Sequence, residues 1–195
     1  MQPLLFDIPT RFETERLVLR CYQAGDGAWY FPMSQRNKLH LERYESGNPV
    51  MTICSQADAE VLVRDFAADW VAHKAFFLAA FKKDTQEFVA QVYVGVVNWD
   101  LPEFEIGYFV DVDHEGQGFI SEAVKEALRF CFKHLGASRL QLKCDDSNLR
   151  SWRVAERRGM VREGHLRLNK KNADGSLSGT FLYGLLRSEF ETQAG

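Results

Sequence analysis

The sequence predicts an α+β, sandwich-like domain in which helices flank a mixed, mostly antiparallel twisted sheet of about seven strands. Three observations support this class. Apolar runs separated by short connections follow one another between residues 75 and 112, which is typical of an antiparallel meander. Amphipathic helical patterns lie on both sides of these runs. An Asp-Gly step between two late strand patterns indicates a hairpin.

The overall composition limits the classes of protein to consider. We interpret residues 1–195 as a single domain, because no linker, repeat or low-complexity run divides them. The net charge of −3 gives no field that would attract nucleic acid or an anionic membrane. No window approaches the ~18 apolar residues of a membrane-spanning helix. Asp7 and Pro9 interrupt the first apolar run, unlike the core of a signal peptide.

The cysteines are widely spaced and form no C-x-x-C pair. Such spacing predicts reduced, buried thiols in a cytoplasmic protein, and it argues against a zinc site. No other spacing of His, Cys and Asp suits a metal, so we expect none. The four cysteines are Cys21, Cys54, Cys131 and Cys144.

The N-terminal part of the chain alternates between strand and helix patterns. Residues 16–22 alternate apolar and polar side chains and predict a strand. Residues 24–49 predict helical pieces that are interrupted at Pro32. Residues 55–74 predict a helix that Ser55 caps, with Asp58 at the reciprocal position. The apolar stripe of this helix consists of Val61, Leu62, Phe66 and Trp70.

The central part contains the meander and a long helix. Residues 75–83, 88–100 and 103–112 each predict a strand. Residues 118–136 form a clear amphipathic pattern, and Gly136 is expected to end that helix.

The C-terminal part continues with one strand, one helix and a hairpin. Residues 138–145 predict a strand and residues 148–159 a helix. Two last strands, at 160–171 and 179–190, flank a turn at 172–176.

Two glycines, Gly116 and Gly118, lie where a strand pattern gives way to a helix pattern. A P-loop would need a Gly-Lys step here, and a dinucleotide fingerprint would need a third glycine where Ser121 stands. Both are excluded. A helix N-terminus after flexible residues can nevertheless bind an anion through its free N–H groups. The alternative is an ordinary glycine turn that Ser121 caps.

The segment "DHEGQGFISEA" resembles the acyl-CoA pyrophosphate loop of the GNAT N-acetyltransferase superfamily, Q/R-x-x-G-x-G/A. Gly116 and Gly118 match it, whereas Asp113 occupies the Q/R position. The segment "NLRSWRVAERRGMVREG" resembles the second motif of the RimL/RimJ-type branch. The segments 14–22, 105–111 and 180–190 are also similar to strands of that branch. The matching residues of the second motif are Asn148, Ser151, Val154, Glu156, Gly159, Glu163 and Gly164.

This resemblance implies the acyl-CoA N-acyltransferase fold, with the fourth family strand splayed from the fifth. It implies direct transfer of an acetyl group from acetyl-CoA to an amine in a ternary complex. The branch suggests the N-terminal α-amine of a protein, such as a ribosomal protein, as acceptor. A small amine such as a polyamine or antibiotic is the alternative. A CoA-binding regulatory module without turnover, and a nucleotide-binding protein unrelated to acyl transfer, also remain open. The branch often forms homodimers.

The resemblance also implies a donor site. Asn148 would bond the pantetheine amide, or it would only cap its helix. Backbone groups near the end of the fourth family strand would pair with the pantetheine or face the carbonyl oxygen; they belong to Phe109, Val110 and Val112. The diphosphate would lie against residues Gly116, Gln117, Gly118, Phe119, Ile120 and Ser121.

Three side chains are candidates for catalysis under this resemblance. Ser151 would protonate the leaving thiolate, or it is an exposed helix serine. Tyr183 is the other hydroxyl candidate, with a place in the core as its alternative. Glu105 would act as general base, or it is a solvated or paired strand carboxylate. The acceptor surface is expected from residues 30–54 and 165–182.

Overall fold

An eight-stranded sheet forms the centre of the computed structural model, which describes residues 3–172 and 174–194. The strands lie in the order β1-β2-β3-β4-β5-β6-β8-β7. All neighbours are antiparallel except β5 and β6, so the predicted mixed, mostly antiparallel sheet is confirmed. Their bounds are β1 Arg11–Glu13, β2 Leu17–Cys21, β3 Ala75–Lys82, β4 Phe88–Asn98, β5 Glu103–Val110, β6 Arg139–Asp145, β7 Val161–Lys171 and β8 Leu177–Leu186. The strand that the sequence did not indicate is the three-residue β1.

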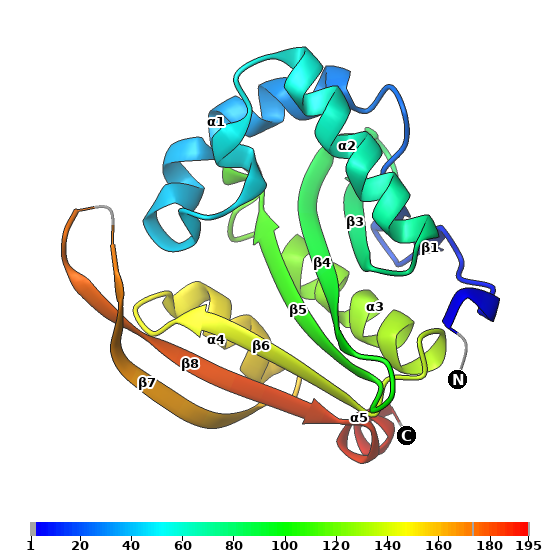
Figure 1. Ribbon diagram of the computed structural model, residues 1–195, viewed down its shortest axis with the longest axis vertical. Coiled ribbons are helices and arrows are strands. Elements are labelled where there is room, and N and C mark those ends of the chain that lie inside the picture. Colours follow the sequence, from blue (N-terminus) through cyan, green and yellow to red (C-terminus); the bar gives the residue numbers. More distant parts are fainter. Residues whose placement is uncertain (1–2, 173, 195) are drawn as a thin grey trace.

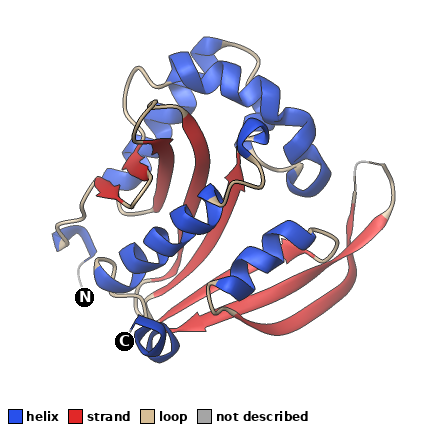
Figure 2. Cartoon of the chain, turned by 180° about the vertical axis from the view of Figure 1, so that it is seen from behind, coloured by secondary structure: helices blue, strands red, loops and turns tan. Residues whose placement is uncertain are grey.

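Helices cover both faces of the sheet. Helices α1 and α2 lie on one face, and α3 and α4 lie on the other (Figure 1, Figure 2). Each pair closes one apolar cluster against the sheet, and together these clusters hold β3, β4 and β5 in place. The helix bounds are α1 Gly27–Glu45, α2 Gln56–Val71, α3 Phe119–Lys133, α4 Leu149–Arg157 and α5 Arg187–Ala194, with short 3₁₀ helices η1 Pro3–Leu5, η2 Pro49–Thr52 and η3 Val112–His114.

The parallel pair β5–β6 is short. Its aligned residues are only Glu103 with Arg139, Phe104 with Leu140, and Glu105 with Gln141. Beyond Glu105 the two strands diverge (Figure 1), as the resemblance implied. The edge of β5 beyond this point is therefore open, although its other edge stays paired with β4 up to Val110.

Helix α1 is continuous, so the predicted interruption at Pro32 is wrong. Proline removes one intrahelical hydrogen bond and usually breaks a helix interior. Here the helix buries one face along its whole length, and this packing outweighs the local penalty of Pro32. The buried residues are Gly27, Tyr30, Met33, Ser34, Asn37 and Leu41.

Helix α2 begins as predicted. The Ser55 side chain accepts a hydrogen bond from the Asp58 N–H (3.1 Å), and Asp58 Oδ2 accepts one from the Cys54 N–H (3.0 Å). The predicted stripe is wrong at Val61, whose side chain is 61% exposed, because the buried face is displaced around the helix. The buried residues of this face are Ala59, Val63, Phe66 and Trp70.

The C-terminal hairpin is confirmed, with one correction. The Asn172 N–H donates to the Ser176 carbonyl (2.8 Å) across the turn, of which residue 173 lies outside the described residues. The predicted strand 179–190 is wrong after Leu186, because α5 begins there. The Leu186 N–H donates to Glu189 Oε2 (2.8 Å), which supports this change to helix.

The prediction that all cysteines are buried is wrong for two of them. Cys131 and Cys144 are buried, whereas Cys21 is half-buried and Cys54 is exposed. All four are free thiols. None of the helices in the described ranges has the length and hydrophobicity to cross a membrane.

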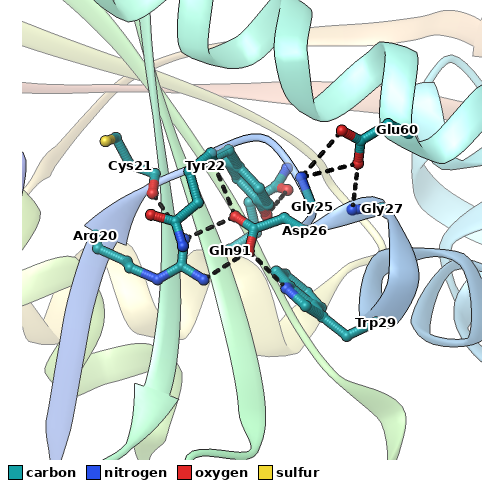
Figure 3. Close-up of polar contacts among 10 residues, drawn as sticks. Arg20, Cys21, Tyr22, Gly25, Asp26, Gly27, Trp29, Glu60 and Gln91 are labelled. Carbon is teal, nitrogen blue, oxygen red and sulfur yellow. Dashed lines mark hydrogen bonds and ion pairs between the residues drawn. The ribbon is translucent and has the colours of Figure 1, made fainter.

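A polar network fastens α1 to the sheet (Figure 3). Asp26 precedes α1 and is 4% exposed. Its carboxylate accepts two hydrogen bonds from the Arg20 guanidinium, at 2.7 and 2.8 Å, and one from Trp29 Nε1 at 2.9 Å. In the same region the Glu60 carboxylate of α2 accepts hydrogen bonds from the N–H groups of Gly25 and Gly27 (Figure 3). These contacts fix where α1 starts.

The ionised form of Asp26 is the stable one in the folded state. Burial opposes ionisation, but the hydrogen bonds from Arg20 and Trp29 outweigh it and lower the pKa of Asp26 below its usual value. Asp26 therefore stabilises the fold above the unfolded-state pKa of about 3.9, and this stabilisation is lost as the pH falls through the lowered pKa.

We predict that Asp26→Asn lowers the free energy of unfolding by about 2–4 kcal/mol at pH 7, because it leaves the Arg20 charge without its partner. The difference from wild type should shrink toward pH 3. Urea denaturation between pH 7 and pH 3 measures it. Asp65→Asn, at an exposed position of α2, is the control and should change little. A difference that stays constant over this pH range would contradict the prediction.

Candidate active site

Two cavities continue the gap between β5 and β6. The first, of about 530 Å³, lies over Phe77 and Tyr93 on the face that α1 and α2 cover. The second, of about 470 Å³, lies against Ile120 of α3 and Val154 of α4 on the other face. Because several residues line both cavities, the two meet beside the open edge of β5. The shared residues are Tyr44, Glu45, Tyr108, Phe109, Asn148 and Ser151.

The glycine corner lies after the end of β5. Gly116 has a φ of 74° and Gly118 a φ of 80°, which is the left-handed region that side chains disfavour. A Cβ atom at Gly116 would meet no atom within 4 Å, so the backbone angle and not the available space requires glycine there. Helix α3 starts directly afterwards, at Phe119.

The backbone N–H groups of this corner are free. No residue in the described part of the chain accepts a hydrogen bond from the N–H groups of residues 116–121. The first N–H that donates is that of Glu122, to the Gly118 carbonyl (3.1 Å). No side chain caps α3, so the predicted alternative of a cap by Ser121 is not observed. Free N–H groups at the positive end of a helix suit a phosphate anion.

An ion pair between a buried carboxylate and a partly exposed arginine ties this corner to α1. Asp111 is fully buried, and its carboxylate is bonded to the Arg36 guanidinium (2.5 Å) and to Asn37 Nδ2 (3.2 Å). Asn37 Oδ1 accepts a hydrogen bond from the Val112 N–H (2.9 Å), so only the carbonyl of Val112 remains available. Arg36 also lies 3.6 Å from Asp113, which stands at the Q/R position of the expected pyrophosphate loop. The positive charge of Arg36 offsets the negative charge of Asp113.

The direction of the β5 backbone decides which groups face the gap. The Asp111 N–H donates to the Val89 carbonyl of β4 (2.9 Å). Since antiparallel pairing alternates, the N–H and C=O groups of Phe109 also face β4. Those of Tyr108 and Val110 face the gap. Phe109 contributes its side chain to the cavities instead.

Asn148 and Ser151 lie together at the start of α4. The Asn148 side chain accepts a hydrogen bond from the Ser151 N–H (3.2 Å), so its helix-capping role is confirmed. Cys144 lines the first cavity with them, and burial raises the pKa of its thiol to about 12. Cys144 therefore stays protonated at neutral pH.

Tyr108 carries a further hydroxyl group at this site, and the sequence did not indicate it. It lines both cavities, and its OH donates to the Ser151 carbonyl (2.8 Å). Burial raises the pKa of Tyr108 well above its usual value, so it remains a hydrogen-bond donor. The sequence feature that indicates Tyr108 is its position in "EIGYFV", near the end of the strand that was expected to diverge from its neighbour.

The other two catalytic candidates have partners of their own. Glu105 lines the first cavity, and its Oε2 accepts from Gln141 (2.9 Å) and from Lys143 (2.8 Å). Tyr183 is 1% exposed, lines neither cavity, and donates to Glu156 Oε1 (3.1 Å). Tyr183 is therefore a core residue, which was the alternative that the sequence left open.

Only one of the two segments expected to bind the acceptor lines the first cavity. Tyr44, Glu45 and residues 47–49, from the end of α1 to the start of η2, line it. The hairpin does not line it, but Lys170 of β7 donates to the Tyr44 carbonyl (2.5 Å) and contacts Asp145 (3.2 Å). Lys170 thus links the end of α1 to Asp145 of β6.

The sequence assigns the chain to a known class of enzyme. Residues 16–161 match the family model described as acetyltransferase (GNAT) domain, and the chain belongs to this family. It is therefore an N-acetyltransferase, and acetyl-CoA is its co-substrate. Within the described residues, no group of three or more His, Cys, Asp or Glu is arranged to hold a metal ion.

Relatives and solved structures agree with this assignment. An uncharacterized N-acetyltransferase, p20 of Bacillus licheniformis, is 25% identical over 182 residues, which cover 91% of this chain and 96% of p20. The ribosomal-protein-S5-alanine acetyltransferase of Vibrio fischeri superposes with a TM-score of 0.81 at 18% identity, covering 93% of this chain and 99% of its own. The RimL ribosomal L7/L12 alpha-N-protein acetyltransferase in complex with coenzyme A has a TM-score of 0.80 at 19% identity, covering 92% and 97%. At these identities the two structures support the fold.

We predict that Tyr183→Phe leaves acetyl transfer within about twofold of wild type, because the Tyr183 hydroxyl lies outside both cavities. The loss of its hydrogen bond to Glu156 should cost about 0.5–1.5 kcal/mol of stability, because water can reach the exposed Glu156 carboxylate. Steady-state thiol release from acetyl-CoA and thermal unfolding measure the two effects. A loss of turnover at full stability would return Tyr183 to the mechanism.

Proposed function

We propose that the protein transfers an acetyl group from acetyl-CoA to an amine by direct attack in a ternary complex. The observation that carries this proposal is the meeting of two cavities at the open edge of β5. One cavity starts near the free N–H groups of residues 116–121, and the other opens over the opposite face. Two substrates can therefore approach one point from different sides, which direct transfer requires.

The donor would occupy the cavity on the α3 side. The diphosphate would accept hydrogen bonds from the N–H groups of residues 116–121. The pantetheine would lie along the open edge of β5, where the backbone groups of Tyr108 and Val110 are available. The Asn148 Nδ2 group can donate to a pantetheine carbonyl while Asn148 Oδ1 caps α4.

The reaction needs a donor at the oxyanion and an acid for the thiolate. The amine nitrogen attacks the thioester carbonyl carbon, and the negative charge that develops on oxygen would be stabilised by the N–H of Val110. When the C–S bond breaks, Ser151 would give a proton to the sulfur, directly or through water. Tyr108 would hold Ser151 in place through its hydrogen bond to the Ser151 carbonyl.

For the acceptor, we propose the N-terminal α-amine of a protein, such as a ribosomal protein. The names of two structural neighbours, an S5-alanine and an L7/L12 alpha-N-protein acetyltransferase, support this class. The free thiols fit the reducing cytoplasm, which we propose as the location. A homodimer stays a prediction from the resemblance, and analytical ultracentrifugation tests it.

We expect CoA release from acetyl-CoA that depends on an added amine. Release is measured with a thiol reagent across amidated peptides with N-terminal serine or alanine, spermidine and an aminoglycoside. Faster turnover of the peptides would support a protein N-terminus as acceptor, and faster turnover of spermidine or the aminoglycoside would contradict it. Binding of acetyl-CoA without release for any amine would leave only a CoA-binding module.

We predict that Ser151→Ala lowers kcat on the order of 100-fold, because the leaving thiolate loses its proton donor. The Kd of acetyl-CoA, measured by calorimetry, should stay unchanged. Ser46→Ala, at the exposed end of α1, is the matched control. Unchanged turnover in Ser151→Ala would remove Ser151 from the mechanism.

A further inference from the structure

Glu45, the last residue of α1, places a carboxylate where the two cavities meet. It lines both of them, together with Tyr108 and Ser151. Asn48 Nδ2 donates to Glu45 Oε2 (2.9 Å) and holds the side chain in position. In residues 3–172 and 174–194, no group donates a hydrogen bond to the other oxygen, Oε1. One carboxylate oxygen is therefore free at the junction.

The other acidic residues that line the cavities are engaged in ion pairs. Asp145 contacts Lys170, and Glu105 contacts Lys143. Glu115, at the end of the second cavity, is paired with Arg150. Among the described residues, Glu45 is the cavity carboxylate that has no ion-pair partner. An incoming cation would find the least compensated negative charge there.

The acceptor of an acetyl group is such a cation. An aliphatic or α-amine is mostly protonated at pH 7, and its nitrogen has no lone pair for attack until one proton leaves. A general base performs best when its pKa is near the working pH. Burial raises the pKa of Glu45, whereas Asn48 and the charge of Lys170 oppose this.

Cationic side chains line the cavities around Glu45, but none of them in the described part of the chain forms an ion pair with it. Lys170 directs its ammonium to the Tyr44 carbonyl and to Asp145 and not to Glu45. The titratable groups that share the two cavities with Glu45 come from several elements, and Lys170 of β7 acts on Glu45 as well. They are His40, Arg43 and Tyr44 of α1, Tyr93 of β4, Glu105 and Tyr108 of β5, Glu115 before α3, Lys143, Cys144 and Asp145 of β6, and Arg150 of α4.

We propose that Glu45 binds the ammonium group of the acceptor and removes its first proton. This inference rests on the proposed acetyl transfer. The ammonium gives one proton to Glu45, and the neutral amine then forms the C–N bond to the thioester carbon. As the C–S bond breaks, the nitrogen loses its second proton and the departing sulfur gains one. The products are the amide, CoA with its free thiol, and one proton, which Glu45 returns to solvent.

The test compares Glu45→Gln with wild type in kcat/KM from pH 5 to pH 10, with an amidated peptide acceptor. Wild type should show a plateau between the raised pKa of Glu45 and the α-amine pKa of about 8. In Glu45→Gln only the neutral amine reacts, so kcat/KM should rise tenfold per pH unit up to about pH 8. The deficit should be on the order of 100-fold at pH 6 and less than about threefold at pH 9, because about 1% of such amines are neutral at pH 6.

Two further variants distinguish this role from a structural one. Glu45→Asp keeps the carboxylate and should retain the plateau at a lower rate. Glu42→Gln, one turn earlier on the exposed side of α1, should match wild type. A wild-type profile in Glu45→Gln, a lost plateau in Glu45→Asp, or weaker acetyl-CoA binding in Glu45→Gln would each overturn the inference.

A binding measurement separates this inference from the proposed function. Calorimetry at pH 7 follows the binding of the same peptide to the protein saturated with CoA, where no turnover occurs. Glu45→Gln should bind at least about tenfold more weakly than wild type. If wild type released no thiol with any amine, the proposed function would fail. If wild type and Glu45→Gln bound the peptide equally well, Glu45 would be rejected as the ammonium site.

Discussion

The short parallel pairing of β5 with β6 is the constraint on which the site depends. Each of these strands has a long antiparallel partner on its other side, β4 for β5 and β8 for β6, and these partners hold the two strands on diverging courses. After three aligned residues their backbones can no longer reach each other. The N–H and C=O groups of Tyr108 and Val110 therefore have no strand partner, and an extended ligand can take that place. The two cavities and the start of α4 lie around this open edge.

The end of β5 is held by charge as well as by the sheet. The buried carboxylate of Asp111 is neutralised by Arg36 and bonded to Asn37, both on α1. A single helix thus positions the entrance to the glycine corner and, at its last residue, places Glu45 beside the first cavity. Because Asp26 fixes the start of the same helix, the polar network at one end of α1 and the candidate base at the other are parts of one rigid element.

Local chemistry accounted for most elements, and the errors have physical reasons. The cap at Ser55 and the turn at 172–176 depend on neighbours in the chain, so the patterns identified them. Pro32 suggested a break because helix propensity takes no account of the face that α1 buries against α2 and the sheet. The strand expected over 179–190 ends early because residues after Leu186 no longer have a strand beside them. The short β1 carries too few residues for any periodicity to be visible.

The glycine corner follows from the order of residues alone. Gly116 and Gly118 permit positive φ angles just before a strong helix, and the free N–H groups result from that local geometry whatever surrounds it. The identity of the reacting side chains is a matter of distance in space. Tyr108 and Tyr183 both lie in strand patterns, but one faces the open edge and the other packs against Glu156. Likewise nothing near Glu45 in the chain distinguishes it from Glu42. The role proposed for Glu45 depends on the gap that strands about 60 residues and more away leave beside it.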